Sequence, residues 1–348
     1  MARLLIITDN AFTYTGREKI CDFMVESLGG SDDVDVFSLR GDGLPFYNYK
    51  NAKELRSFAR EKYPLLSIIK EINKRDYDLV FVVSMGRLSV YFSFLFSIFG
   101  RKSKESLIAC EHVSLDSLSV AIRFLKRIAL SKYDKVVVLT ERDGKKLASW
   151  GINNTVIYNP IKYNDYKKIN RSRHALAVGR LSKQKNFSSL LNIWSRFIKN
   201  NHSDWMLNIA GDGELKDELI QQASRLKISN NVQFLGRINN IDDYYKNADL
   251  CLMTSIYEGL PLALLEAKSW SVPVIAYDCP TGPREIISDK VDGFLVELND
   301  EDSFLANLEY LASNDNVYFQ LSAGTCNVSS QFSEERIKSL WRNLVCGK

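Results

Sequence analysis

The sequence predicts an α/β protein that contains two doubly wound parallel sheets, and three observations lead to this expectation. Short apolar runs with strand character alternate with longer segments of helical period along most of the chain. A polar and charged stretch at residues 162–173 interrupts the alternation, which then restarts. The length of 348 residues suits two domains of roughly 150 residues each.

These patterns divide the chain into an N-terminal domain at residues 1–161, an interdomain linker at 162–173, a C-terminal domain at 174–330 and a C-terminal helix at 331–348. Apolar residues such as Ile337 and Trp341 recur at helical spacing in the last part. We therefore expect that helix to pack on the surface of a core.

The expected elements follow from the positions of the apolar runs. Strands of the first domain are expected at residues 4–8, 34–39, 79–84, 107–109, 135–139 and 156–160, with helical segments at 17–28, 52–74, 88–99 and 118–132. Strands of the second domain are expected at 175–179, 205–210, 232–235, 250–253, 274–276 and 293–296, with helices at 187–198 and 215–226. Thr140 should cap the helix that follows residues 135–139.

Composition narrows the class of protein. The formal charge of +4 is too small for a dedicated nucleic-acid binder, but its excess lies in the first half and suits an approach to anionic lipid. Six cysteines without a C-x-x-C pair indicate reduced thiols in the cytoplasm. The chain opens on a strand pattern rather than a signal peptide, and its longest apolar run, 88–99, is shorter than the ~20 residues that cross a bilayer.

The stretch 250–267 predicts an anion site. It reads as a buried strand, a glycine turn and a helix that begins near Pro261. The backbone N–H groups of Gly259, Leu260 and Leu262 would lie at the start of this helix, where the helix dipole is positive, whereas Pro261 has no N–H. We expect a phosphate there.

Two carboxylates flank this helix start. Glu258 and Glu266 lie eight residues apart, so both can face one groove and each can accept two hydrogen bonds from a sugar diol. The alternative is a helix cap and a solvated helix face. Glu266 lies in an apolar context, where a carboxylate requires a partner.

Other candidates follow further strand ends. Arg180 and Lys185, after the strand at 175–179, could hold a diphosphate, or they could be solvated surface charges. Gly211 belongs to a tight Gly-Asp-Gly turn expected to line the cleft, and His112 follows the strand at 107–109, where it could be catalytic or structural.

Three further signals are less specific. Gly16 lies in a loop between the first strand and the first helix, as in a nucleotide-binding α/β domain. Asp33 and Asp35 form a D-x-D, but they follow a glycine turn and are expected to be ordinary turn and strand residues rather than metal ligands. The segments 88–99, followed by the basic residues 101–104, and 118–132 are either core helices with charged outer faces or a face that docks on anionic lipid.

Taken together, these motifs resemble the retaining glycosyltransferases of family 4, whose GT-B fold has two Rossmann-like domains facing each other across a cleft. The E-x7-E signature of that family is similar to Glu258–Glu266, its G-R-L-x-x-x-K element to residues 179–185, and its A-G-x-G element to residues 210–213. The family's G-G-x-E-R loop is similar to residues 15–19, with Thr15 in place of the first glycine.

The resemblance implies transfer of a sugar from a nucleotide diphosphate donor with retained anomeric configuration, without a cofactor or a required metal. Arg180 and Lys185 would neutralise the leaving diphosphate, Glu258 would hold hydroxyls of the donor sugar, Glu266 the ribose, and His112 the hexose. Gly16, Gly211 and the helix start at 259–262 would complete the donor site.

The segment 279–286 resembles members that use UDP-hexoses or their N-acetylated forms to build bacterial surface polysaccharides. The resemblance therefore favours a UDP-sugar donor and a lipid-linked oligosaccharide acceptor in capsule, O-antigen or lipopolysaccharide synthesis, at the inner face of the cytoplasmic membrane. A nucleotide-sugar epimerase of the same fold, a dinucleotide-dependent oxidoreductase and a non-catalytic nucleotide-sugar-binding subunit are the alternatives.

Overall fold

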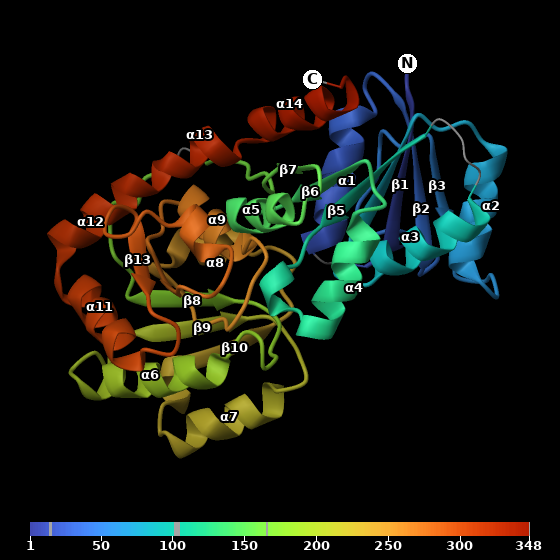
Figure 1. Cartoon of the computed structure of the whole chain (residues 1–348). Coiled ribbons are helices and arrows are strands. Elements are labelled where there is room, and N and C mark those ends of the chain that lie inside the picture. The colour runs from blue at the N-terminus through green and yellow to red at the C-terminus, as the bar shows by residue number, and fades with distance from the viewer. Residues whose placement is uncertain (14–15, 101–104, 165, 348) are drawn as a thin grey trace. The chain divides into compact units, whose positions relative to one another are not determined.

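The computed structural model describes residues 1–13, 16–100, 105–164 and 166–347 (Figure 1). The chain folds into two compact units, one made of Met1–Pro160 with Glu334–Lys348 and the other of Ile161–Ser333. Each unit is built around its own parallel sheet, with helices in the connections. The expected α/β class with two sheets is confirmed.

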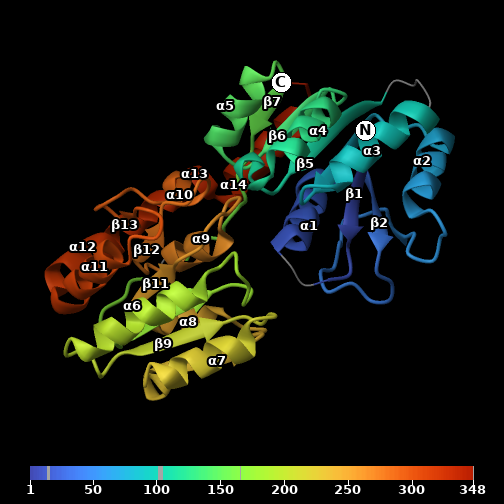
Figure 2. The ribbon, with the colours of Figure 1, turned by 60° about the horizontal axis from the view of Figure 1, so that its bottom comes forward.

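Within the described residues, the sheet of the first unit has seven strands in the order β3-β2-β1-β4-β5-β6-β7. The strands are β1 (Arg3–Asn10), β2 (Asp33–Arg40), β3 (Glu54–Ser57), β4 (Leu79–Ser84), β5 (Ser106–Glu111), β6 (Lys135–Val138) and β7 (Asn154–Val156). The helices are α1 (Gly16–Leu28), α2 (Pro64–Lys74), α3 (Leu88–Phe99), α4 (Val120–Leu130), α5 (Glu141–Ser149) and α14 (Glu334–Val345). Figure 2 shows β1 beside β2, to which it is hydrogen-bonded in parallel register.

Strand β1 shows how this sheet acquires a layer on each face. Its residues Leu4, Leu5, Ile6 and Ile7 are all fully buried. Leu4 and Ile6 join one hydrophobic cluster, whereas Leu5 and Ile7 join another. Because successive side chains of a strand point to opposite faces, a continuous apolar run requires cover on both sides.

Two expected elements of the first unit differ from the structure. The span 52–74 was expected to be helical throughout, but it contains the edge strand β3, which pairs with β2, followed by α2, with Pro64 as its first residue. The last strand of this unit, β7, covers Asn154–Val156, so residues 157–160 lie beyond it. Proline at 160 has no N–H to contribute to a ladder.

The C-terminal helix α14 packs on the first unit, as its apolar spacing predicted. Ile337 and Trp341 are buried in the cluster that also contains Leu4 and Ile6. The ring centroids of Trp341 and Phe81, a residue of β4, lie 6.0 Å apart. The C-terminal helix therefore helps to cover one face of the first sheet.

In the described part of the second unit, six parallel strands have the order β10-β9-β8-β11-β12-β13. They are β8 (His174–Val178), β9 (Met206–Ala210), β10 (Val232–Gly236), β11 (Leu250–Met253), β12 (Val274–Tyr277) and β13 (Gly293–Val296). The helices are α6 (Phe187–Lys199), α7 (Lys216–Arg225), α8 (Asp242–Asn247), α9 (Leu262–Ser269), α10 (Pro283–Ile286), α11 (Glu301–Ser313), α12 (Asp315–Gly324) and α13 (Val328–Phe332).

The expected linker at 162–173 is part of this second unit rather than a separate connection. The reason is the buried carboxylate of Asp249, which lies 2.9 Å from Lys168 Nζ and accepts hydrogen bonds from the backbone N–H groups of Ser172 and Arg173. A buried charge requires such partners, so the segment is held against the amino end of β11, which begins directly after Asp249. In the part of the chain that the structure describes, no helix is both long and apolar enough to cross a bilayer.

Candidate active site

The carboxyl ends of β8 and β11 define the switch point of the second sheet. These two strands are neighbours, and the chain continues from β8 to β9 on one side and from β11 to β12 on the other. Parallel α/β sheets bind ligands in the crevice outside such a point. The loops that follow, 179–186 and 254–261, carry half of the predicted site residues, namely Arg180, Lys185, Glu258, Gly259 and Leu260.

Hydrogen bonds join these two loops. Ile256 N–H donates to Gln184 O over 2.9 Å, and Gln184 Nε2 donates to Tyr257 O over 2.9 Å. The Thr254 hydroxyl donates to Asn186 O over 3.0 Å. The two loops therefore form one rigid structure at the strand ends.

Lys185 and Glu258 form an ion pair in this structure. Lys185 Nζ lies 2.6 Å from Glu258 Oε1, and both side chains are largely screened from solvent. A Cβ atom on Gly179 would lie only 3.0 to 3.2 Å from the Lys185 side chain, so glycine leaves room for it. The sequence predicted both residues but not that they pair.

Arg180 is directed differently. Its side chain is exposed and pairs with Glu214 over 3.2 Å. Because both groups are solvated, this pair contributes little to stability and is easily exchanged for another anion. The structure therefore brings Lys185 and Glu258 together and leaves Arg180 on a separate partner.

The turn after β9 packs directly on the loop after β8. Gly211 has φ +139°, and a Cβ atom there would lie 1.9 Å from Gly179 O. A Cβ on Gly213 would lie 2.4 Å from Leu181 O, and Leu181 N–H donates to Asp212 O. Both glycines are therefore required by close backbone approach.

Helix α9 begins at Leu262 after Pro261, as the sequence predicted. The N–H of Leu262 lies in the first turn, which has no preceding helical carbonyl to bond. Gly259 and Leu262 are partly exposed and Leu260 is buried.

Two residues that sequence reasoning missed support this turn. The Thr281 hydroxyl donates to Glu258 O over 2.6 Å, and a Cβ on Gly282 would lie 2.5 Å from Gly259 O at φ +97°. The Thr-Gly-Pro run at 281–283 is a turn signal that could have indicated this. Burial and the nearby charge of Glu258 raise the pKa of the Cys279 thiol to about 12, so it remains protonated.

Glu266 has a buried partner, as its apolar context required. The Tyr245 hydroxyl, on α8, donates to Glu266 Oε2 over 3.1 Å and lies 3.3 Å from Ala263 O. Burial, with the charge of Glu266 as the next cause, raises the pKa of Tyr245 well above its usual value. Tyr245 carried no sequence signal because it comes from another helix.

His112 lies in the first unit directly after β5. Its N–H donates to Ser84 O over 3.0 Å, which continues the ladder between β5 and β4. Burial, assisted by the charge of Arg17, lowers the pKa of His112 from 6.5 to about 4, so the imidazole is neutral near pH 7. Gly16 is the first residue of α1, whereas Thr15 lies outside the described residues.

The D-x-D motif takes part in structural contacts. The carboxylate of Asp35 is buried, accepts a hydrogen bond from the Tyr77 hydroxyl over 2.7 Å and pairs with Arg3 over 3.3 Å. Asp33 pairs with Lys53 at the surface. Among the described residues, no group of three His, Cys, Asp or Glu side chains is placed to hold a metal ion.

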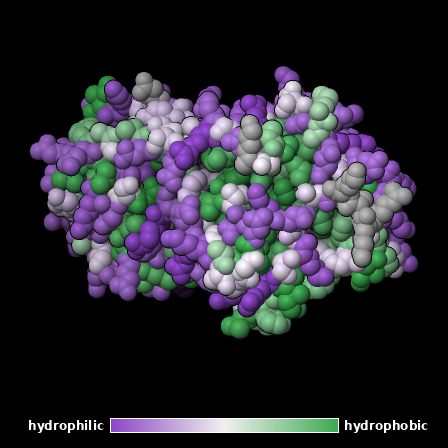
Figure 3. Space-filling view, turned by 45° about the horizontal axis from the view of Figure 1, so that its top comes forward, coloured by the Kyte–Doolittle hydropathy of each residue, from purple (hydrophilic) through white to green (hydrophobic). Residues whose placement is uncertain are grey.

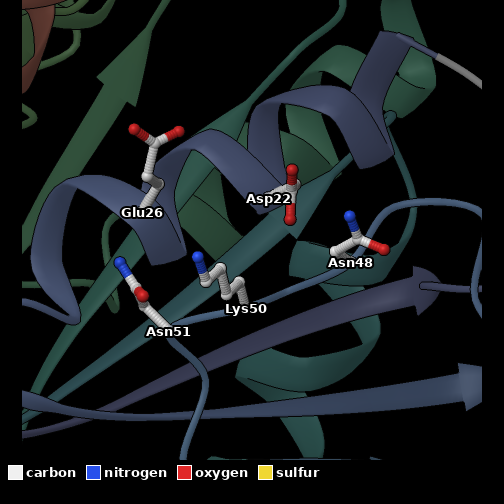
Figure 4. A pocket seen from close by; sticks show the side chains of 5 residues that line it. All are labelled: Asp22, Glu26, Asn48, Lys50 and Asn51. Atoms are coloured by element: carbon white, nitrogen blue, oxygen red, sulfur yellow. The ribbon is translucent and has the colours of Figure 1, made fainter.

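A polar hollow in the first unit lies between α1 and the loop before β3 (Figure 4). It is lined by Asp22, Glu26, Asn48, Lys50 and Asn51. The loop precedes β3, so the hollow lies towards the amino edge of the sheet, whereas ligands of parallel sheets bind at the carboxyl edge. We do not assign it to the active site.

Comparisons with known proteins agree with these motifs. A family model described as "Glycosyl transferases group 1" matches residues 162–325. The chain is 33% identical to the amylovoran biosynthesis glycosyltransferase AmsD of Erwinia amylovora, over 99% of this chain and 100% of that protein.

A second relative is named GalNAc-alpha-(1->4)-GalNAc-alpha-(1->3)-diNAcBac-PP-undecaprenol alpha-1,4-N-acetyl-D-galactosaminyltransferase and comes from Campylobacter jejuni. It is 26% identical over 95% of this chain and 94% of its own length. The crystal structure of Anabaena Alr3699/HepE in complex with UDP-glucose superposes with a TM-score of 0.83 at 17% identity and full coverage of both chains. This likeness concerns the fold and confirms the expected GT-B class.

Proposed function

Because the chain belongs to the Glycosyl transferases group 1 family, we propose that it is a retaining, metal-independent hexosyltransferase. It moves a hexose or N-acetylhexosamine from a UDP-sugar to a lipid-linked oligosaccharide during synthesis of a bacterial capsule, O-antigen or lipopolysaccharide. The whole-length relatives support the setting, since one is named for amylovoran biosynthesis and another for an undecaprenol-linked acceptor. The Anabaena protein, solved with UDP-glucose, supports the donor class.

The Lys185–Glu258 pair at the switch point is the observation that carries the proposal. As the glycosidic bond to the donor breaks, negative charge develops on the leaving diphosphate. A lysine already positioned there stabilises that charge without reorganisation. Arg180 leaves its exposed partner Glu214 and adds a second cation, and the two together take the place of a metal ion.

The remaining residues bind and orient the donor. Glu258 accepts hydrogen bonds from hydroxyls of the hexose, and Glu266, oriented by Tyr245, accepts those of the ribose. The backbone of Gly211 and the start of α9 at 259–262 surround the phosphates, and Gly16 completes the donor site. His112 is neutral and contacts the hexose near the reacting carbon.

We propose a same-face displacement for the chemical step. The acceptor hydroxyl attacks the anomeric carbon as the bond to the diphosphate breaks, and the leaving phosphate oxygen takes the hydroxyl proton. Anomeric configuration is retained because attack and departure occur on one face. A trapped covalent glycosyl-enzyme would contradict this step.

The proposed place of action is the cytoplasmic side of the membrane that carries the lipid-linked acceptor, where the enzyme is peripheral. Nucleic acid is not a partner. The net charge of +4 is positive enough for contact with an anionic membrane surface, but too small for a dedicated nucleic-acid binder.

The test is a transfer assay with a panel of UDP- and GDP-sugars and a lipid diphosphate-linked oligosaccharide. Lys185→Met should lower kcat/KM by about 10²- to 10³-fold, because it removes a positioned charge from the transition state. Lys183→Met is the matched control, since Lys183 is an exposed lysine of the same loop. Equal activity of Lys185→Met and Lys183→Met would contradict the assignment.

Three further readouts separate the alternatives. Activity should survive EDTA, and a loss would make Asp33 and Asp35 metal-ligand candidates again. The product should have the donor's anomeric configuration by NMR. Release of an epimerised free sugar nucleotide without acceptor would indicate the epimerase instead.

A further inference from the structure

Helix α4 presents its apolar side to solvent. Val120, Phe124 and Leu125 are 79%, 63% and 48% exposed, and Ile128 is also exposed. The buried face of the same helix contains Lys126, whose side chain is fully buried, together with Ala129 and Leu130. The larger apolar stripe thus faces solvent, whereas a helix that covers a core turns its apolar stripe inward.

A buried ion pair holds α4 in this orientation. Lys126 Nζ lies 2.7 Å from Glu111 Oε2 and donates hydrogen bonds to Gly86 O over 2.6 Å and to Ser89 Oγ over 2.8 Å. Rotating the helix to bury its apolar face would leave the buried carboxylate of Glu111 without its cation, which is strongly unfavourable. The exposed apolar face is therefore a stable feature of the first unit.

Basic side chains lie beside this apolar face. The charged side chains of α4 are Arg123, Lys126 and Arg127, of which Lys126 is buried and Arg123 lies 3.9 Å from the carboxylate of Asp116. Helix α3, which packs against α4, has no Asp, Glu, Lys or Arg between Leu88 and Phe99. Arg127 is exposed. Lys132, just beyond α4, is exposed and bonds Ser97 of α3 over 3.1 Å. Ile98 and Phe99 add exposed apolar area at the end of α3.

Figure 3 shows hydrophobic side chains gathered in a protrusion at the lower edge of that view. The exposed apolar residues of α4 and of the end of α3 are Val120, Ile122, Phe124, Leu125, Ile128, Ile98 and Phe99. The basic residues 101–104, which the sequence placed beside this face, lie outside the described residues.

We propose that the exposed face of α4, with the end of α3, docks on an anionic phospholipid bilayer. Apolar and aromatic side chains flanked by basic ones match the acyl and headgroup layers of such a surface. At 11 residues, or about 16 Å, α4 is too short to span the ~30 Å hydrocarbon core, so it lies in the plane of the interface. A second copy of the chain is a poorer occupant, because it would bring like charges together.

This inference rests on the proposed function only in that a lipid-linked acceptor requires a membrane. Of the two interpretations of residues 118–132, the largely apolar outer face of α4 favours the second, a face that docks on anionic lipid. The buried lysine couples this face to Glu111, the residue before His112.

The experiment is vesicle flotation of the full chain with phosphatidylglycerol–phosphatidylcholine vesicles and with phosphatidylcholine alone. The wild-type chain should float with the anionic vesicles, and added salt should weaken the association. The double variant Phe124→Ser/Leu125→Ser should bind at least about tenfold more weakly, because burial of one such side chain alone contributes about that factor. The control is Ile220→Ser, an exposed apolar residue on α7.

Charge supplies a second, independent variant. Arg127→Glu should lower binding to anionic vesicles several-fold, and Arg127→Lys should retain it. Wild-type flotation by the double variant would overturn the proposal. It would also be overturned by a concentration-dependent dimer that the double variant abolishes while vesicle binding remains unchanged.

UDP binding, measured as thermal stabilisation, tests the proposed function separately from the docking proposal. All the α4 variants should bind UDP as the wild-type chain does. A chain that binds UDP but no anionic vesicle overturns the docking proposal alone. One that binds vesicles but neither UDP nor any nucleotide sugar overturns the proposed function alone.

Discussion

Replacement of Gly211 by alanine should be severely destabilising. The new Cβ would lie 1.9 Å from Gly179 O, well over an ångström inside ordinary contact distance, and φ +139° is a conformation that side chains rarely adopt. Overpacking costs about 1–3 kcal/mol and such backbone strain about 1–3 kcal/mol, so we expect a loss of about 2–6 kcal/mol. The strain also separates the 179–186 loop from the turn after β9.

Gly236→Ala is the matched control because the two glycines are direct neighbours. Gly211 N–H donates to Gly236 O, and Gly236 also has a positive φ, +67°, but nothing lies within 4 Å of its added Cβ. Its cost should be only the left-handed backbone penalty of about 1–2 kcal/mol.

Differential scanning calorimetry with and without UDP is the assay. Gly211→Ala should lower the Tm of the second unit by roughly 5–20 °C and weaken UDP binding at least about tenfold, whereas Gly236→Ala should lower the Tm by a few degrees. Equal Tm shifts for the two variants would refute the close-approach reasoning. Wild-type UDP binding by a folded Gly211→Ala chain would refute the placement of the donor.

Two further predictions concern Tyr245 and His112. Tyr245→Phe removes the hydrogen bond to Glu266, so UDP should bind about tenfold more weakly, with little change in kcat. Calorimetric titration measures the UDP affinity and initial rates measure kcat. Unchanged UDP affinity would argue against a positioning role for Tyr245. Burial lowers the pKa of His112 from 6.5 to about 4. Between pH 4 and pH 6.5, therefore, His112 is protonated in the unfolded chain but neutral in the folded one. Stability should therefore be complete above pH 6.5 and fall by up to about 3 kcal/mol as the pH drops towards 4. Denaturant titrations of wild type and His112→Gln test this, since the variant should lack that component.

Local pattern was sufficient for most of the framework. Buried strands such as residues 4–8 and 250–253 were predicted because a parallel sheet covered on both faces requires continuous apolar runs. Thr140 caps α5 through a hydrogen bond from Asp143 N, as its side chain chemistry predicted. The helix start after Pro261 followed from the restrictions that proline places on its own position.

Edges and boundaries were less predictable. The edge strand β3 has four half-buried residues, so no apolar run marks it within the expected helix. The span 162–173 looked like a linker because it is polar, yet Lys168 is held by Asp249, a partner about eighty residues away. Such partners leave no trace in local periodicity.

Local period, turn chemistry and motif spacing were enough to predict the fold class, the two sheets and the residue types at the strand ends. Which of those residues meet depends on how distant parts of the chain fold together. The tertiary structure paired Lys185 with Glu258, placed Arg180 on Glu214 and turned the apolar face of α4 outward. Ion pairs form between side chains that are close in space, whatever their separation in the sequence. The buried carboxylate of Glu111 requires a cation, and Lys126 of α4 supplies it, which leaves most of the apolar residues of this helix exposed.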